Sequence, residues 1–359
     1  MPDHLPEGAG KVSGGYVMKR ELQIAADKLI REIFGVKPGE TVTITTDYDS
    51  NMAVTRAVAD AVQEAGGLPM VIQCPTPRGV GKAADPDLPI EAMTAALCAT
   101  DVWIEFNHQW LLYSAPFERA SEVNRKLRYM CLVDFNEELL IRTVGHVDTP
   151  KLQVFMRKVA ERTRNARTMH VTTPAGTDVT FEIDPVHYVA CDCGDATFPA
   201  AHMLTGQINV VPKFGSIEGT IVFDGCVTPP FGRVPDAPVR LTVEHGVITA
   251  VTGGRDAETY KAYLRGFDDP GMLKMAHIAY GFNPGAKLTG NIVEDERVWG
   301  ATEWGIGYVS NVDAPPCGQD AVSHSDGICL NSTVWLDGQC IMREGVIVDK
   351  ELSALDPTV

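Results

Sequence analysis

The chain has 359 residues, 45% of them hydrophobic and 22% charged, which is typical of a globular protein long enough for two domains. Its 31 basic and 47 acidic residues give a formal net charge of -16, which argues against nucleic acid and anionic membrane surfaces as partners. No apolar run approaches the roughly 18 residues that span a bilayer, and residues 1–17 are polar and glycine-rich without a signal-peptide core. We therefore expect a cytoplasmic protein.

The nine cysteines are odd in number and lie mostly in apolar segments, as expected of reduced thiols in a core. The only two that are close in sequence belong to Cys191-Asp192-Cys193. Because no second pair stands at zinc-finger spacing, we interpret this segment as a loop rather than as a metal site.

Strands and helices alternate through the first part of the chain, as judged from apolar periodicity and from β-branched runs between turn residues. Helices are expected at 18–34, 52–65, 90–98, 117–129, 137–143 and 151–165, and strands at 41–46, 68–74, 102–106 and 130–134. This alternation is typical of βαβ units, so residues 1–165 are predicted to form a three-layer α/β domain with a parallel sheet. No G-x-G-x-x-G motif follows a strand, which leaves nucleotide binding unsupported.

The pattern changes near residue 166, after which strands dominate. Two hairpins are expected, at 169–173 with 179–183 and at 239–243 with 247–251, the second with His245 in an exposed turn. Further strands are expected at 208–211, 220–224, 333–336 and 340–348, and one helix at 256–267. Residues 166–359 are therefore predicted to form an α+β domain on a curved, mostly antiparallel sheet or half-barrel.

A His-x-Asp motif near the C-terminus is the strongest candidate for chemistry. If residues 323–326 are extended, His324 and Asp326 point to the same side of the strand. With His277, from an apolar segment upstream, they would form a metal site of two histidines and one carboxylate, which leaves one side of the ion open. A single His-x-Asp is more often a surface pair or a hydrogen-bonded buried histidine. The apolar neighbours favour the metal site, because polar side chains in buried strands need partners.

Several segments of the second half resemble the superfamily of two-metal aminopeptidases known as aminopeptidase T. They are Gly206-Gln207-Ile208-Asn209-Val210-Val211-Pro212, Glu218-Gly219-Thr220-Ile221-Val222-Phe223-Asp224, Gly281-Phe282-Asn283-Pro284-Gly285-Ala286 and His324-Ser325-Asp326. Within this superfamily, the segment from His277 to Gly281 and the His-x-Asp motif are more similar to the 2,5-dihydroxypyridine 5,6-dioxygenase family of nicotinate breakdown. The resemblance covers most of residues 166–350 and implies that His277, His324 and Asp326 hold Fe(II).

The resemblance also implies roles for four other residues. His108 follows a predicted strand, where a parallel sheet presents its active-site loops, and resembles a pocket histidine, so we predict that it acts as the acid/base catalyst. His202 resembles a second pocket histidine and is predicted, with Gln207 and Glu303, to contact the substrate; whether Glu303 also binds the metal is left open. For each histidine alone, an ordinary loop or core histidine is the alternative.

The activity that this resemblance implies is that of an extradiol-like, non-haem Fe(II) dioxygenase. Such an enzyme adds both atoms of dioxygen to a hydroxylated N-heteroaromatic ring such as 2,5-dihydroxypyridine, giving N-formylmaleamate. The expected partners are a small aromatic substrate and dioxygen, and the expected assembly is a homo-oligomer, a dimer or larger.

Two other functions stay open from the sequence. The first is a metal-dependent aminopeptidase in which Glu303, His324 and Asp326, with or without Gln207, hold zinc or cobalt. The aminopeptidases have glutamates where this chain has Gln207 and His277, so two charges that a two-metal cluster needs are missing. The second is a non-catalytic protein of the same fold with structural histidines.

Overall fold

The computed structural model describes residues 9–359, which form two compact units. The first contains residues up to Val147 together with Gly194–Leu204, and the second contains Asp148–Cys193 and Thr205–Val359. This division differs from the predicted boundary after residue 165, because the helix that ends at Asn165 packs with the second unit and residues 194–204 return to the first. Part of the glycine-rich start, residues 1–8, lies outside the described residues.

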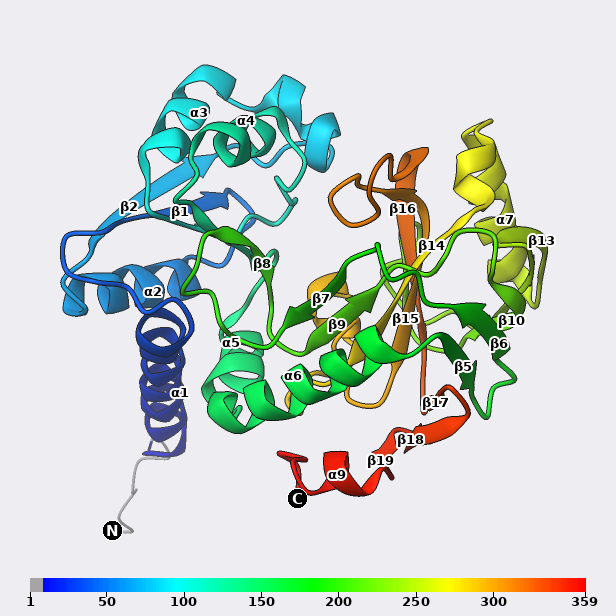
Figure 1. The fold of residues 1–359 in the computed structure, drawn as a ribbon. Helices are drawn as coiled ribbons and strands as arrows, with labels where there is room; N and C mark the ends of the chain where they lie inside the picture. Colours follow the sequence, from blue (N-terminus) through cyan, green and yellow to red (C-terminus); the bar gives the residue numbers. More distant parts are fainter. Residues whose placement is uncertain (1–8) are drawn as a thin grey trace, which may run out of the picture. The chain divides into compact units, whose positions relative to one another are not determined.

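A five-stranded parallel sheet forms the centre of the first unit, in the order β2-β1-β3-β4-β8. Its strands are β1 (Thr41–Asp47), β2 (Leu68–Cys74), β3 (Val102–Glu105), β4 (Arg128–Cys131) and β8 (Ala200–Met203). Its helices are α1 (Ala9–Lys28), α2 (Met52–Glu64), α3 (Ile90–Ala99), α4 (Ala115–Val123) and α5 (Glu137–Leu140), with short helical turns at Leu29–Ile33, Gly81–Asp87 and Ile141–Gly145. Figure 1 shows α3 and α4 on one side of the sheet and α1 and α2 on the other, which confirms the predicted three layers.

Two helices of this unit differ from the prediction. The first begins at Ala9, well before residue 18. The helix expected at 117–129 ends at Val123, and β4 begins at Arg128. The chain turns at Asn124, whose side-chain amide donates hydrogen bonds to the carbonyls of Leu97 and Thr100 and so holds the end of α4 against α3.

The second unit contains two antiparallel sheets rather than one curved sheet. The larger has the order β13-β12-β10-β6-β5-β17-β18-β19, and the smaller has the order β11-β16-β15-β14-β9-β7. The strands of the larger sheet are β5 (Thr168–Thr172), β6 (Asp178–Glu182), β10 (Glu218–Phe223), β12 (Val239–Glu244), β13 (Val247–Thr252), β17 (Thr333–Leu336), β18 (Gln339–Arg343) and β19 (Val346–Ile347). Those of the smaller are β7 (Val189–Asp192), β9 (Gln207–Val210), β11 (Val227–Thr228), β14 (Met275–Gly281), β15 (Thr302–Val309) and β16 (Gln319–Cys329). The helices are α6 (Thr149–Asn165), α7 (Arg255–Gly266), α8 (Ile292–Asp295) and α9 (Lys350–Ser353), with a turn at Pro270–Leu273.

Several local predictions can be compared with this unit. The mostly antiparallel α+β character is confirmed, and His245 lies in an exposed hairpin turn with φ of 51°. The segment at Cys191 is not a loop, because Cys191 and Asp192 end strand β7. The run at 340–348 is a hairpin of two strands that turns at Glu344 and Gly345, both with positive φ.

The smaller sheet has one face that is covered within the unit and one that carries polar residues. On the covered face, the Tyr280 hydroxyl lies 3.1 Å from the Thr163 hydroxyl of α6, and the Trp304 ring packs on Phe181 of the larger sheet. Because side chains alternate along strands, the residues next to Tyr280 and Trp304 point to the other face. The candidate site lies there.

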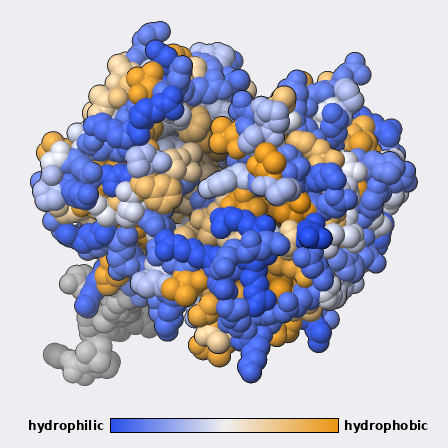
Figure 2. Space-filling model, in the orientation of Figure 1, coloured by the Kyte–Doolittle hydropathy of each residue, from blue (hydrophilic) through white to orange (hydrophobic). Residues whose placement is uncertain are grey.

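The surface is as polar as the charge balance suggests. The face drawn in Figure 2 is covered mainly by hydrophilic residues, with smaller apolar areas among them. In the described part of the chain, no helix combines the length and apolar character that crossing a bilayer requires. All nine cysteines lie among the described residues, none of them forms a disulfide there, and five of them are buried.

Candidate metal centre

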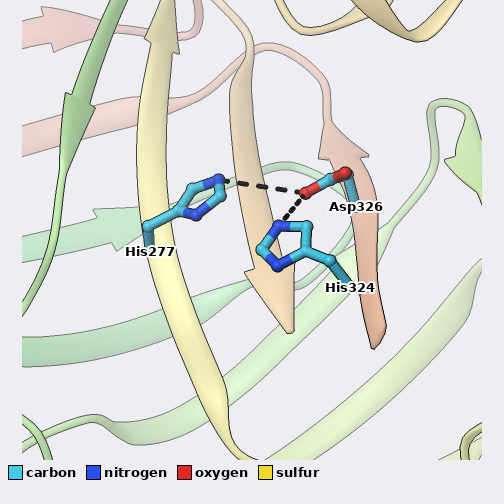
Figure 3. A group of neighbouring side chains, drawn as sticks. All are labelled: His277, His324 and Asp326. Carbon is cyan, nitrogen blue, oxygen red and sulfur yellow. Dashed lines mark hydrogen bonds and ion pairs between the residues drawn. The ribbon is translucent and has the colours of Figure 1, made fainter. Parts of the chain in front are cut away.

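Three neighbouring strands bring together the histidines and the carboxylate that the sequence singled out. His277 of β14 pairs with Gly305 of β15, and Gly305 pairs in turn with Asp326 of β16. His324 precedes Asp326 by two residues on β16, which is extended there as predicted. Residues directly opposite one another in a sheet share a face, so the three side chains meet over β15, as Figure 3 shows.

The distances between these side chains suit a single ion. The Nε2 atom of His324 lies 2.9 Å from Oδ1 of Asp326, and Nε2 of His277 lies 3.8 Å from the same oxygen. One ligand atom from each residue falls within 4.8 Å of the others. Neighbouring ligands on a divalent ion with bonds of about 2.1 Å stand about 3 to 3.4 Å apart. The donors are therefore close to the spacing that an ion requires.

Gly305 leaves the space in which the His277 ring lies. A Cβ atom built on Gly305 would stand 2.4 Å from Cε1, 2.6 Å from Nδ1 and 2.8 Å from Nε2 of His277. The imidazole thus crosses the strand directly above the glycine. The pairing of β14 with β15 also shifts register between Met275 and His277, and such bulges re-aim side chains beside functional sites.

The His324 ring is held so that its Nε2 atom faces the site. Its Nδ1 lies 2.9 Å from the backbone carbonyl oxygen of Tyr308, which can only accept a hydrogen bond, so Nδ1 carries the proton. In the neutral ring, Nε2 then presents a lone pair toward the Asp326 oxygen, and two acceptors at that distance repel each other. A cation relieves this repulsion. A hydrogen bond on the ring nitrogen that faces away from the metal orients metal-binding histidines in this way.

The pKa of His324 also indicates that a positive charge is favourable at this cluster. Burial opposes the protonation of His324, but the Asp326 carboxylate overcomes it and raises the pKa of His324. Burial and the nearby His324 lower the pKa of His277 to about 4, so this ring is neutral at physiological pH. Neutral imidazole is the form that binds metals. Two imidazoles and one carboxylate therefore fit a divalent transition metal.

A buried carboxyl group, that of Glu303, lies next to His277 on the same face of the smaller sheet. Oε2 of Glu303 lies 3.0 Å from Nε2 of His277, and its Oε1 is buried with no hydrogen-bond partner among the described residues. Burial and the Asp326 charge raise the pKa of Glu303 well above its usual range. Glu303 nevertheless stands outside the set of three ligand atoms. It is a neighbour of His277 in the candidate centre.

Gln207 connects two charged residues that the sequence analysis did not single out. Its amide nitrogen donates to Glu296 over 3.0 Å, and its amide oxygen accepts from Arg297 over 2.7 Å. Burial raises the pKa of Glu296 to about 7, although Arg297 works in the opposite direction. Both halves of the Gln207 amide thus have partners inside the protein. The sequence analysis did not identify Glu296 or Arg297, because they belong to no recognisable motif. They follow the short helix α8, and only the folding of the chain brings them to Gln207.

The other two predicted histidines belong to the first unit. His108 follows β3, its backbone N–H donates to Asp47 over 2.8 Å, and its Nδ1 lies 2.8 Å from Oδ1 of Asp134. The hydrogen bond with Asp134 raises the pKa of His108. His202 lies on β8 and is buried, with Nε2 2.9 Å from the carbonyl oxygen of Phe198. His108 therefore lies at the carboxyl ends of β1 and β3, where it was predicted.

Comparison with known proteins shows which proteins this chain is similar to. A solved structure of 2,5-dihydroxypyridine dioxygenase from Pseudomonas putida KT2440 is similar with a TM-score of 0.76 and 21% identity, over 93% of this chain and 99% of that one. Wild-type AmpT from Thermus thermophilus has a TM-score of 0.67 and 17% identity, over 92% of this chain and all of that one, 100%. At these identities the likeness establishes the fold.

The sequence comparisons are more specific. The 2,5-dihydroxypyridine 5,6-dioxygenase of P. putida KT2440 is 29% identical over 206 residues, which are 53% of this chain. That match spans 57% of the relative, a little over half of its length. The family model described as NicX, 2,5-dihydroxypyridine 5,6-dioxygenase, matches residues 30–349. The chain therefore belongs to the 2,5-dihydroxypyridine 5,6-dioxygenase family.

Proposed function

We propose that this protein is a ring-cleaving dioxygenase that acts on a hydroxylated N-heteroaromatic ring such as 2,5-dihydroxypyridine. The observation that carries the proposal is the cluster of His277, His324 and Asp326 on one face of the smaller sheet, in a chain of this family. Opening the bond between the hydroxyl-bearing C5 and C6 with both atoms of dioxygen gives N-formylmaleamate. This is an extradiol-like cleavage, because the broken bond lies beside the hydroxylated carbon.

The proposed cofactor is Fe(II), held by His277, His324 and Asp326. Two imidazoles and one carboxylate on one side of an ion leave positions for a substrate hydroxyl and for dioxygen. Bound Fe(II) would supply the redox chemistry that lets triplet dioxygen react with a closed-shell ring. The chain contributes the orientation of the donors: Tyr308 holds His324 in one tautomer, and Gly305 leaves room for His277.

We propose His108 as the acid/base residue. Its support is its position at the carboxyl ends of β1 and β3 and the pairing of Nδ1 with Asp134, which leaves Nε2 as the atom that takes and returns a proton. His202, Gln207 and Glu303 are proposed to contact or orient the substrate. Of the three, Glu303 has a buried oxygen without a partner, which favours it most.

The aminopeptidase is the less supported alternative. The family model favours the dioxygenase, and the likeness to AmpT shows a shared fold only. Gln207, one of the ligands that an aminopeptidase site would use here, has both halves of its amide bound to Glu296 and Arg297. We further propose that the protein is cytoplasmic and that it forms a homo-oligomer. Light scattering of the purified protein would test the oligomeric state.

Oxygen uptake tests the proposed function. Anaerobically purified protein is loaded with Fe(II) or Zn(II), 2,5-dihydroxypyridine is added, and dissolved oxygen and ring absorbance are followed together. We expect about one dioxygen consumed per ring with Fe(II), and none with Zn(II). His324→Ala is expected to abolish uptake, whereas the control His245→Ala changes an exposed turn histidine of the same unit and is expected to retain it. Uptake that survives His324→Ala would contradict the proposed centre.

A further inference from the structure

Unpartnered buried polar atoms gather on the face of the smaller sheet that carries the candidate centre. Among the described residues, the buried atoms without a hydrogen-bond partner include Oδ1 of Asn209, Oγ1 of Thr228 and Oε1 of Glu303. Leaving such an atom unsatisfied costs about 1 to 3 kcal/mol. For Asn209, a ligand bound beside the centre can supply the missing partner.

The register of the sheet places Asn209 beside the centre. Asn209 of β9 is directly opposite Ala279 of β14, and Ala279 is opposite Glu303 of β15. Opposite residues share a face, so Asn209 points to the same side as Glu303 and His277. Asn209 is the diagonal neighbour of His277, and such neighbours lie about 7 to 8 Å apart. This spacing of the backbone positions places Asn209 close enough to contact a small ring bound beside His277.

The chemistry of an amide matches one edge of the proposed substrate. A 2-hydroxypyridine in its lactam form presents a ring N–H next to a carbonyl oxygen. An asparagine side chain presents a carbonyl oxygen next to an N–H donor. The two edges can pair through two parallel hydrogen bonds, in which Oδ1 of Asn209 accepts the ring N–H and Nδ2 donates to the ring carbonyl.

We propose that Asn209 recognises the lactam edge of the substrate and sets the preference for rings that carry a lactam over hydroxylated rings that lack one. This inference rests on the proposed function and deepens it by naming a specificity-determining residue. Thr228 has an unpartnered hydroxyl on the same face, but it pairs with Asp326 on the side away from Asn209. Thr228 therefore serves as the matched control.

Anaerobic titration separates ring recognition from catalysis. Fe(II)-loaded protein is titrated without dioxygen, once with 2,5-dihydroxypyridine and once with 3-hydroxypyridine, which keeps a ring hydroxyl but lacks the lactam. Asn209→Leu is expected to raise the Kd for 2,5-dihydroxypyridine about 100-fold and to leave the Kd for 3-hydroxypyridine within about threefold. Thr228→Val is expected to leave the ratio of the two Kd values at its wild-type level.

A stability readout accompanies the titration. Asn209→Leu removes a buried oxygen without a partner, so its melting temperature and iron content are expected to equal or exceed those of the wild type. If this variant does not fold, Asn209→Asp keeps the shape, loses the N–H donor and is expected to bind 2,5-dihydroxypyridine at least tenfold more weakly.

The outcomes separate the two proposals. Wild-type protein that binds 2,5-dihydroxypyridine, with an Asn209→Leu variant that keeps the wild-type preference, would overturn the role of Asn209 alone. Wild-type protein that binds neither ring would overturn the proposed function, and the inference with it. Loss of the preference in Asn209→Leu but not in Thr228→Val would support both.

Discussion

Replacing Gly305 by alanine tests how the sheet positions the candidate ligands. The added Cβ would stand 2.4 Å from Cε1 of His277, whereas non-bonded carbon atoms normally approach to about 3.5 to 4.0 Å. The imidazole must therefore move by about 1 Å or more, away from its position beside Asp326. Loss of a residue that only hydrogen-bonds to a metal ligand already lowers metal affinity by about 10- to 100-fold. Displacing a ligand is expected to lower the affinity for Fe(II) by at least about 100-fold.

The fold is expected to survive this substitution. Gly305 does not have a positive φ, so alanine can adopt its backbone conformation. The clash involves the His277 side chain, which can rotate away. Alanine also restricts the unfolded chain more than glycine does, which stabilises the folded protein by about 0.4 to 1 kcal/mol. The melting temperature without metal should therefore stay within a few degrees of the wild-type value.

Metal titration under anaerobic conditions, with circular dichroism as the fold control, measures both effects. Gly266→Ala is the matched control, because a Cβ at Gly266 meets nothing within 4 Å. It should bind Fe(II) as the wild type does. A Gly305→Ala protein that folds and binds Fe(II) with wild-type affinity would refute the reasoning that links Gly305 to the position of His277.

Three further predictions concern pH and metal. Glu105 is fully buried and its pKa rises from 4.5 to about 7, so the folded protein holds a proton that the unfolded chain releases. Stability should then fall by about 3 kcal/mol between pH 4.5 and 7, and urea unfolding should show this fall in the wild type but not in Glu105→Gln. The Asp134 hydrogen bond raises the pKa of His108, so Asp134→Asn should move the acid limb of the kcat/KM profile to lower pH if His108 is the base. An unmoved limb would argue against that role. Fe(II) at 100 times its Kd should raise the free energy of unfolding by about 2.7 kcal/mol, and thermal melts should show no such gain in His324→Ala.

The sequence predicted the parts of the site that follow local rules. The alternation of His324 and Asp326 along an extended strand and the apolar segment around His277 are local patterns, and the structure contains both strands. Helices and strands of the first unit also appeared near their expected positions, because apolar periodicity reports burial directly.

The missing parts depend on contacts between distant segments. Strand β15 was not predicted, because Gly305 and Gly307 weaken its strand character, yet Gly305 is what gives His277 its space. The glycine at position 305, inside a run of strand-forming residues, was the available sign that another side chain packs closely against the backbone there. Strand β8 pairs with β4 across about 70 residues of chain. The residues that lie opposite Asn209 on the neighbouring strand depend on the register between strands, which no single segment of the sequence determines.

We propose that this protein inserts both atoms of dioxygen into a hydroxypyridine ring at the His277, His324 and Asp326 centre. Mass spectrometry of the product formed from 2,5-dihydroxypyridine under oxygen-18 gas, with Fe(II)-loaded protein, tests it most directly. The claim predicts N-formylmaleamate that carries two labelled oxygen atoms, and no labelled product from His324→Ala. A product with one label or none, or an unchanged ring, would contradict it.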